Sequence, residues 1–558
     1  MTDYNPPIRD MSFVLNELLG FSSDIIDTET MEAVLDEAAK LASEVLAPLN
    51  WIGDEHGLKL ADDHSVNMPP GFKDAYEQYR DGGWNAVPFE EEYGGQGLPW
   101  ALAFGVQEMW QGANMAFGLC PLLNQGAVEA ILSHGSDEMK AFYLPKLVSG
   151  EWTGTMNLTE PQSGSDLGLL KAKAERADDG HYKIFGQKIW ITYGEHDFSD
   201  NIIHLVLARL PDAPDDVKGI SLFIVPKYLE DGSRNDVKCV GLDHKLGIHA
   251  SPTCVMQYGD EGGAKGYLVG EENQGLKYMF TMMNIARLSV GLQGVAVAER
   301  ALQHAAAYAS ERVQGRSFDS GERVTIDQHA DVRRMLMTAK ALTEAGRAVT
   351  YDAAIAVDAS NKGDAAAQAK VDLLTPIVKS WCTDIAQEVT YLAIQIHGGM
   401  GFIEETKVAQ YYRDARILPI YEGTNGIQAA DLAFRKTLRD GGAVTGAYID
   451  ALEQDLPADK GDVLKDYLED LREASKILVE RGAAGDLNGV GAMSTPYLKA
   501  FGLIAGGVMM ARAGQIAKDK AGDPYYDEKL ETCEFYLGNI LPLAKAQIEI
   551  AVKGSLKL

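Results

Sequence analysis

The chain has 558 residues, of which 46% are hydrophobic and 24% are charged, and its 81 Asp and Glu residues against 51 Lys and Arg give a formal net charge of -30. This composition is that of a soluble globular protein and excludes a fibrous or disordered chain. A negative surface repels DNA, RNA and anionic membranes, so no nucleic-acid partner is expected. At roughly 100–200 residues per domain, the length suggests three to five structural units.

Cysteine usage and the N-terminal sequence indicate a reducing compartment. The cysteines form no CxxC or metal-ligand spacing, which predicts reduced, mostly buried thiols and no metal site. No basic segment precedes an apolar run at the N-terminus, so no signal peptide is expected. The apolar run 501–511 is shorter than the roughly 18 residues of a spanning helix. We therefore expect a cytoplasmic protein without membrane insertion. The five cysteines are Cys120, Cys239, Cys254, Cys382 and Cys533.

The first half of the chain changes from a helical pattern to a strand pattern. Apolar residues recur at helical spacing between Thr30 and Pro48, and Pro48 is expected to end that helix. A Gly-rich break follows at 92–97, and a second helical stretch runs to Lys146. From about 151 to 270, segments rich in β-branched and aromatic residues alternate with Gly, Asp and Pro, which predicts short antiparallel strands.

The second half returns to the helical pattern, with an Ala-rich segment at 295–312 as a strong example. Residues 439–442, Arg-Asp-Gly-Gly, are typical of a linker. The expected fold is mainly α with a central antiparallel β domain. The expected domains are a helical domain (1–150), a β domain (151–273), a helical bundle (274–438) and an extra C-terminal helical domain (447–558).

The common catalytic and nucleotide-binding motifs are absent from the sequence, because no GxGxxG unit, GxxxxGK[ST], HExxH or GxSxG occurs. Three polar segments that border regular structure are the candidates for chemistry: 156–166, 187–192 and 421–425. Clustered hydroxyls and glycines in the first can offer backbone N–H groups to a phosphate or a heteroaromatic edge. Each segment alone also has an ordinary interpretation, as a turn, a core Trp and a solvated Glu.

Taken in order, seven segments resemble the acyl-CoA dehydrogenase family over about residues 75 to 437. The extra helical tail and the N-terminal segment Asn5-Pro6-Pro7-Ile8-Arg9-Asp10 resemble a branch that includes 3-(methylthio)propanoyl-CoA dehydrogenases and some fatty acyl-CoA dehydrogenases. The seven segments are EYGG (92–95), YLPKL with SGEW (143–152), LTEPQSGSD (158–166), GQKIWIT (186–192), QIHGGMGF (395–402), RDAR (413–416) and YEGT (421–424).

The resemblance implies that FAD is the cofactor, held between the β domain and the helical bundle. Its flavin contacts would be Leu158, Thr159, Trp190 and Thr192. The remaining cofactor contacts would be Ser165, Thr424 and, from the neighbouring subunit, Arg312, Gln314, Gln395, Gly398 and Gly399. The substrate contacts would be Ser165, Asn284, Arg287, Tyr421 and Gly423. Gln314 and Asn284 depart from the family pattern, which often has Thr in an Arg-Lys-Thr-Phe-Gly segment and Asp before the CoA-binding arginine.

The resemblance also implies α,β-dehydrogenation of an acyl-CoA to its trans-2-enoyl-CoA, with Glu422 as catalytic base. Some family members carry the base immediately before the CoA-binding arginine, but that position is Ala286 here. The implied substrate is 3-(methylthio)propanoyl-CoA, with a short- or medium-chain fatty acyl-CoA as the alternative. An electron-transfer flavoprotein would accept the electrons, and the tail favours a homodimer over a tetramer.

The sequence is compatible with four other hypotheses about function. An acyl-CoA oxidase shares most of these segments, although oxidases generally have longer chains. A flavin monooxygenase of the same fold usually lacks the Glu. A DNA-associated, non-catalytic relative would need a basic face, which a net charge of -30 disfavours. A helical scaffold without catalysis would not explain the order of the seven segments.

Overall fold

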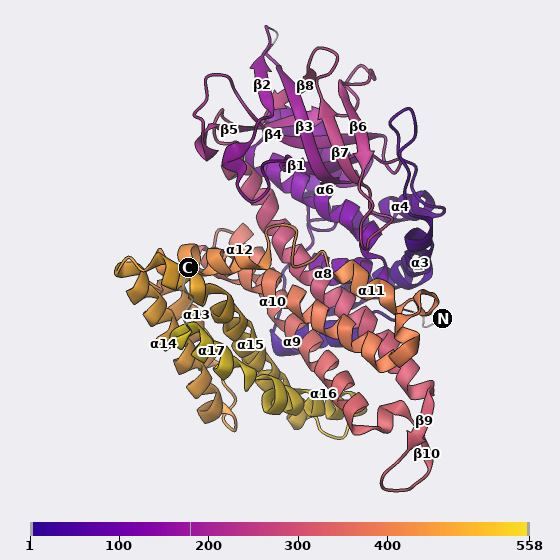
Figure 1. Ribbon diagram of the computed structural model, residues 1–558, viewed down its shortest axis with the longest axis vertical. Helices are drawn as coiled ribbons and strands as arrows, with labels where there is room; N and C mark the ends of the chain where they lie inside the picture. Colours follow the sequence, from indigo (N-terminus) through magenta and orange to yellow (C-terminus); the bar gives the residue numbers. More distant parts are fainter. Residues whose placement is uncertain (1–3, 179, 555–558) are drawn as a thin grey trace. The chain divides into compact units, whose positions relative to one another are not determined.

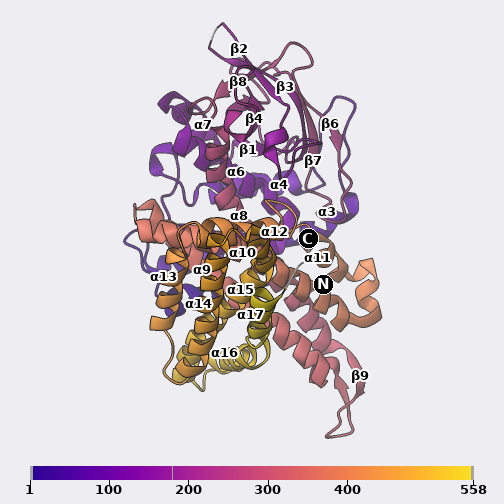
Figure 2. The same ribbon diagram turned by 60° about the vertical axis from the view of Figure 1, so that its left-hand side comes forward.

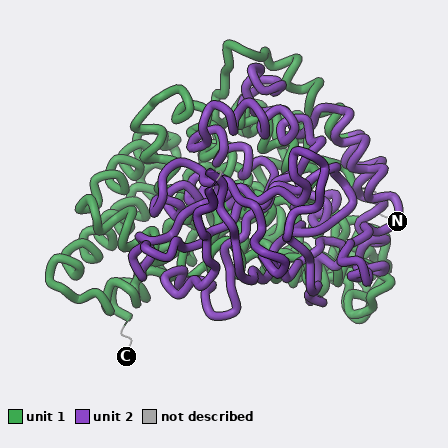
Figure 3. Tube along the Cα trace, turned by 90° about the horizontal axis from the view of Figure 1, so that it is seen from above, with its two compact units in different colours: residues 1–39, 100–112, 287–558 green, residues 40–99, 113–286 purple. Residues whose placement is uncertain are grey.

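The computed structural model describes residues 4–178 and 180–554, and it divides into two compact units, which Figure 3 colours separately. Unit 1 comprises residues 1–39, 100–112 and 287–558. Unit 2 comprises residues 40–99 and 113–286. The units do not follow the chain order, because the first helices are divided between them.

The β strands of unit 2 form a barrel-like sheet. Neighbouring strands are hydrogen-bonded in the order β1-β4-β5-β8-β3-β7-β6. Strand β2 lies outside this order and pairs with both β3 and β4. The pairing therefore closes a ring through β4, β5, β8, β3 and β2, so those five strands leave no open edge between them. The strands are β1 (Trp152–Asn157), β2 (Lys173–Arg176), β3 (Tyr182–Thr192), β4 (Asn201–Arg209), β5 (Ile220–Pro226), β6 (Val237–Leu242), β7 (Thr253–Tyr258) and β8 (Ala264–Leu268).

Helix α6 packs closely against strand β1 in unit 2 (Figure 1). Gly154 of β1 permits this, since a Cβ there would lie 2.3 Å from Cβ of Ala127. Helix α6 is apolar on all sides and is buried over most of its length, as expected for a core helix. The helices of unit 2 are α3 (Ala47–His56), α4 (Phe72–Asp81), α6 (Met115–His134), α7 (Asp137–Ser149) and the beginning of α8 (Gly275–Glu311).

Unit 1 is helical, with a β hairpin between α8 and α9. Figures 1 and 2 show α9, α10 and α15 side by side, so the C-terminal helices pack directly on the central bundle. The elements of unit 1 besides most of α8 are α1 (Ile8–Ser12), α2 (Thr28–Lys40), α5 (Trp100–Ala113), β9 (Val313–Arg316), β10 (Arg323–Thr325), α9 (Ala330–Asn361), α10 (Ala365–His397), α11 (Val408–Ala415), α12 (Asn425–Ala430), α13 (Ala443–Gln454), α14 (Gly461–Ala483), α15 (Leu487–Asp519), α16 (Pro524–Phe535) and α17 (Leu543–Lys553).

Two glycines let α15 lie against the indole of Trp381 on α10. A Cβ at Gly502 would lie 2.4 Å from Cγ of Trp381, and a Cβ at Gly506 would lie 2.4 Å from its Cη2. Because Trp381 is buried, its indole cannot move away without disturbing the core. The extra C-terminal helices are thus joined to the bundle by a close, apolar contact.

We expect Gly506→Ala to lower the free energy of unfolding by about 1–3 kcal/mol, since the added methyl group overpacks this contact. Gly491→Ala on the same helix is the matched control, because nothing lies within 4 Å of a Cβ there. Alanine at that position should raise the free energy of unfolding by about 0.5–1 kcal/mol. Urea denaturation of both variants measures the difference, and equal stabilities would contradict the packing.

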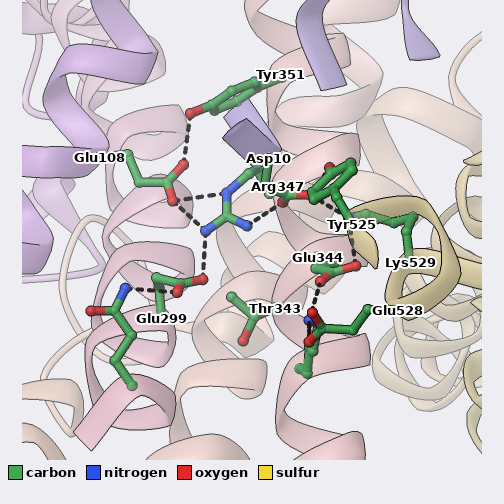
Figure 4. A network of polar contacts seen from close by, with 12 residues as sticks. Asp10, Glu108, Glu299, Thr343, Glu344, Arg347, Tyr351, Tyr525, Glu528 and Lys529 are labelled. Atoms are coloured by element: carbon green, nitrogen blue, oxygen red, sulfur yellow. Dashed lines mark hydrogen bonds and ion pairs between the residues drawn. The ribbon is translucent and has the colours of Figure 1, made fainter. Parts of the chain in front are cut away.

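A buried ionic network connects the N-terminal segment, the bundle and the C-terminal helices of unit 1 (Figure 4). Its centre is Arg347 of α9, whose side chain is 1% exposed. The guanidinium contacts Asp10 at 2.6 Å, Glu108 at 2.7 Å and Glu299 at 2.8 Å. Lys529 of α16 contacts Asp10 as well, so one carboxylate joins two cations from distant parts of the chain.

Two expectations about local structure are wrong, and a third, the antiparallel sheet, is confirmed for most strand pairs but not for all. Pro48 does not end the first helix, because helical backbone continues through the π-helical segment Leu41–Leu46 into α3, whose first turn contains Pro48. The sheet is not wholly antiparallel, since β1 pairs in parallel with β4, and β2 also meets β4 in parallel. The segment after α8 is not helical, because Val313–Thr325 forms the β9–β10 hairpin, in which Gly315 has φ +77°.

The cysteines and the apolar helices are core features. All five cysteines are free and buried, as predicted. Among the described residues, α6 and α15 are long and apolar enough to cross a membrane by length and composition alone. However, 89% and 83% of their most apolar windows are buried in the protein, which is the pattern of core helices. The run 501–511 is therefore part of a longer apolar helix than the sequence suggested.

Candidate active site

Glu422 lies in a turn whose backbone is unusual for its residue types. It has φ +54°, and Gly423 has φ +83°, so two consecutive residues are left-handed. This conformation is costly for a residue with a side chain and persists only where the surroundings hold it. Helix α12 begins directly afterwards, and the Thr424 hydroxyl accepts a hydrogen bond from Ile427 N at 3.3 Å to cap it.

Side chains from α8 and α12 hold this turn. Arg287 Nε of α8 donates to the Glu422 carbonyl at 3.3 Å, and Gln428 Nε2 of α12 donates to the same oxygen at 3.1 Å. The Tyr421 hydroxyl donates to Oε1 of Gln293, which is fully buried on α8. The left-handed conformation of Glu422 is therefore fixed from both sides of the residue.

The charge on the Glu422 carboxyl is set by opposing effects. Burial raises its pKa above the ordinary value, while Arg287 and Lys379 act in the opposite direction through their charge. Within the part of the chain that the structure describes, no group accepts a hydrogen bond from the Glu422 N–H. A half-buried carboxylate and an available backbone donor therefore lie on one residue.

At the end of strand β3 in unit 2, Trp190 turns out of the sheet. The β3–β7 register shifts between Lys188 and Ile191, and Trp190 has φ +59°. Its side chain is 61% exposed, although Lys188 and Ile191 are buried. A bulge next to a site commonly serves to redirect a side chain, and here it presents an aromatic face beside the half-buried Thr192.

The polar segment after β1 is fastened to β3 by a buried ion pair. Lys188 Nζ lies 2.8 Å from Glu160 Oε1 and donates to the Leu158 carbonyl at 3.0 Å. Ile189 N donates to the Thr159 carbonyl at 2.9 Å. Burial lowers the pKa of Lys188 to about 8, against the opposing charge of Glu160. Leu158 and Thr159 therefore have a fixed position relative to Trp190.

Two helix ends of unit 1 meet where the resemblance placed contacts to an adenosine group. The ring of His397, at the end of α10, stacks on Tyr308 of α8 with centroids 4.2 Å apart. Arg312 follows Tyr308 by one turn, and its Nη2 donates to Gln314 Oε1 at 3.4 Å. The residues of this set are all exposed: Arg312, Gln314, Gln395, Gly398 and Gly399.

Family models match almost the whole chain. They are the acyl-CoA dehydrogenase N-terminal domain at residues 28–151, the middle domain at 155–260, the C-terminal domain at 273–436 and the acetyl-CoA dehydrogenase C-terminal-like domain at 444–558. The chain belongs to the acyl-CoA dehydrogenase family. As a member of that family, it is an oxidoreductase that uses FAD.

Relatives of known name agree with the family over the full length. A 3-methylmercaptopropionyl-CoA dehydrogenase of Ruegeria pomeroyi is 46% identical, covering 98% of this chain and 97% of its own. A butyryl-CoA dehydrogenase of Syntrophomonas wolfei is 34% identical, covering 97% and 95%. Among solved structures, Caenorhabditis elegans ACDH-11 in complex with C11-CoA has a TM-score of 0.78 at 19% identity, covering 100% of this chain and 97% of that one, and it supports the fold.

The residues present fit FAD. Among the described residues, no acceptor receives a hydrogen bond from the N–H of Leu158 or Thr159 or from the Thr159 hydroxyl. These donors match the carbonyl oxygens of a flavin pyrimidine ring, and the exposed Trp190 offers a flat face for its ring system. A Cβ at Gly398 or Gly399 would meet nothing within 4 Å, so their backbone is accessible to a phosphate.

The structure brings together only part of the predicted site. Arg287, Tyr421 and Gly423 lie around Glu422 in unit 1, with Thr424 at the start of α12. Ser165 is exposed in unit 2, and Asn284 is half-buried on α8 within that unit.

The residue patterns missed Lys379 and Gln293, as well as the Lys188–Glu160 pair. A Lys in the apolar pattern of 371–386 was the available signal for the first. The EPQ and GQK segments contained the ion pair, but their spacing of 28 residues gives no sign of contact.

Proposed function

We propose that the chain oxidises 3-(methylthio)propanoyl-CoA to 3-(methylthio)acryloyl-CoA, with Glu422 as the catalytic base. The observation that carries the catalytic assignment is the held, left-handed turn that places a carboxylate and a backbone donor on one residue. The support for the substrate is the 46% identity to 3-methylmercaptopropionyl-CoA dehydrogenase over nearly the full length, against 34% for butyryl-CoA dehydrogenase.

Charge explains the roles of these residues. A thioester α-proton becomes removable when the developing enolate oxygen is stabilised, and a positioned donor is typically worth roughly 10²–10³ in rate. The Glu422 N–H supplies such a donor. The Glu422 carboxylate takes the α-proton, and a positioned base typically accelerates such a proton transfer by roughly 10²–10⁴-fold. Bound FAD supplies the acceptor for the β-hydride. Arg287 binds the CoA ester together with Asn284 and Ser165, and it also orients the Glu422 peptide.

The cofactor contacts belong to the same proposal. Leu158, Thr159, Trp190 and Thr192 hold the flavin, Ser165 lies near the pyrophosphate, and Thr424 is a further cofactor contact. A homodimer supplies the adenosine contacts from the second subunit. Their exposure in unit 1 supports this arrangement. These partner-supplied residues are Arg312, Gln314, Gln395, Gly398 and Gly399.

The same proposal includes the acceptor, the compartment and the domains. An electron-transfer flavoprotein takes the electrons, in a cytoplasmic protein without membrane insertion. Four domains, 1–150, 151–273, 274–438 and 447–558, organise the chain. The matched family models begin and end near these boundaries, which supports the division.

The substrate assignment predicts that 3-(methylthio)propanoyl-CoA has the highest kcat/KM in a panel with butanoyl-, pentanoyl-, hexanoyl- and octanoyl-CoA, measured with an artificial electron acceptor. Pentanoyl-CoA is the matched control, because it differs only by a methylene in place of the sulfur. One methylene more or less in an apolar pocket changes kcat/KM by roughly 10–200-fold, so the panel distinguishes acyl chains of different length. A tenfold or greater preference for a longer acyl chain would favour the fatty acyl-CoA alternative, which the name of the butyryl-CoA relative supports.

A further inference from the structure

Lys379 of α10 is a fully buried lysine beside the Glu422 turn. Its side chain is 0% exposed, and its Nζ donates to Oδ1 of Asn425 at 3.0 Å. Burial of a cation is expensive unless it is paired. Burial lowers the pKa of Lys379 to about 7, while the charges of Glu422 and Asp384 act to raise it. A residue with this cost needs a compensating role.

Asn425 connects Lys379 to the turn. It is the first residue of α12, three positions after Glu422. Its side-chain nitrogen donates to Ser380 O at 3.1 Å and to Asp384 Oδ1 at 2.8 Å. Its side chain also lies 3.0 Å from the Thr383 hydroxyl. One turn of α10 therefore holds Asn425 from several sides, and it fixes where α12 begins and where the turn before it lies.

The charged groups around Glu422 come from several elements. Arg287 on α8 and Lys379 on α10 both lower its pKa, and both oppose the effect of burial. Arg287 in turn interacts with Asp431 and Arg435 of the segment after α12. Asp384 of α10 interacts with Lys379, and Lys499 of α15 lies 3.6 Å from Asp384. The charges of these two cations thus oppose the effect of burial on one carboxyl.

We infer that Lys379 is a positioning residue for Glu422, which holds the catalytic turn through Asn425 and supplies a buried positive charge that keeps the carboxyl ionised. The inference rests on the proposed role of Glu422 as base. Below about pH 7, where Lys379 carries its charge, this cation opposes proton binding by the buried carboxyl, which must be ionised to accept a proton from the substrate. Lys379 contacts neither substrate nor flavin in this role and acts through Glu422.

The test is Lys379→Met, which keeps an unbranched side chain of similar shape and removes the charged amino group. Loss of the cation should raise the pKa of Glu422, so the acidic limb of kcat/KM against pH should move upward by about one pH unit or more. At a fixed pH on that limb, kcat/KM should fall about tenfold when the pKa of Glu422 rises by one. Lys379→Arg, which keeps the charge, should leave the limb closer to that of the wild type.

Stability separates positioning from a structural role. The folded pKa of Lys379 lies below its unfolded value, so the unfolded chain binds more protons between about pH 7 and pH 10. The wild type should therefore gain stability as pH rises through that window, and Lys379→Met should lose this gain. At pH 7 the Met variant should have a Tm no lower than that of the wild type. A variant that failed to fold, or had a much lower Tm, would overturn the inference.

The matched control is Lys370→Met on the same helix, which removes an ion pair to Asp352 at 2.6 Å, with the lysine side chain 34% exposed. Its pH profile should coincide with that of the wild type. The inference is overturned if Lys379→Met leaves the acidic limb in place, or if Lys370→Met moves it equally.

Infrared titration of the Glu422 carboxyl in the holoenzyme without substrate provides a readout other than turnover. Glu422→Gln identifies the carboxyl band by removing it. A higher titration midpoint in Lys379→Met supports the inference, and an unchanged midpoint overturns it. Normal turnover by Glu422→Gln would instead refute the proposed function, whatever the infrared result.

Discussion

Arg347→Met is expected to lower the free energy of unfolding by about 3–5 kcal/mol, because it leaves three buried carboxylates without their shared cation. Glu108 is 0% exposed, and Asp10 and Glu299 are each 11% exposed in their side chains. The network in Figure 4 also includes the Tyr351 hydroxyl, which donates to Glu108 at 2.8 Å. Chemical denaturation at pH 7 measures the loss.

Arg334→Met on the same helix is the control. Its pair with Asp331, at 2.9 Å, has side chains 55% and 75% exposed, so its removal should cost less than about 1 kcal/mol. Similar losses in the two variants would show that the buried network contributes no more than a surface ion pair.

The loss in Arg347→Met should also depend on pH in a defined direction. Without the guanidinium, the effect of burial on Glu108 loses the charge that opposes it, so the folded pKa of Glu108 rises further above the unfolded value. A raised carboxyl pKa imposes a cost that grows as pH rises above about 4, the unfolded value. The difference in stability between wild type and variant should therefore shrink as pH falls from 8 to 5. In the wild type, Lys529 and Arg347 instead hold the pKa of Asp10 well below its usual range.

This network explains why the N-terminal segment and the C-terminal helices were difficult to place from the sequence. Asp10 and Arg347 are 337 residues apart, and Asp10 and Lys529 are 519 apart. Charged residues at such separations give no local pattern, and each alone is typical of a solvated surface. Their pairing becomes visible only when helices from three parts of the chain pack together.

The order of helical and strand regions could be predicted from the sequence, because the spacing of hydrophobic residues indicates which face of an element is buried. The change from helix to strand near Glu151 and back near Gln274 follows the periods of 3.6 and 2. The parallel pairing of β1 with β4 was not readable, since it depends on which strands meet rather than on their composition. Pro48 misled for a similar reason, because a proline can begin a helix as well as end one.

At the candidate site, the YEGT segment singled out Glu422 as the proposed base, but the sequence did not indicate which residues surround it. Lys379 and Gln293 are polar residues in helices whose other residues in these regions are mostly apolar and typical of a buried core. Their function depends on which turn of which helix faces residue 422, and sequence spacing does not contain that information. Trp190 was singled out as an aromatic residue, whereas the bulge that exposes it required the register of β3.

Glu422→Gln should lower the rate of substrate oxidation by roughly 10²–10⁴-fold, because the amide cannot accept the α-proton. Substrate binding should remain within a few fold, since Gln keeps the backbone N–H and the shape of the turn. Arg287 Nε and Gln428 Nε2 contact the carbonyl of residue 422, which the substitution leaves in place. Glu473→Gln on α14, with a side chain 53% exposed, is the control and should behave as the wild type.

The most direct measurement is the anaerobic reduction of the bound flavin in a single turnover, followed by its loss of absorbance after mixing with 3-(methylthio)propanoyl-CoA. We expect the flavin of the wild type and of Glu473→Gln to bleach rapidly, whereas Glu422→Gln should bind the ester and keep its oxidised, yellow flavin on that time scale. Bleaching of Glu422→Gln at the wild-type rate would contradict the assignment of Glu422 as the base.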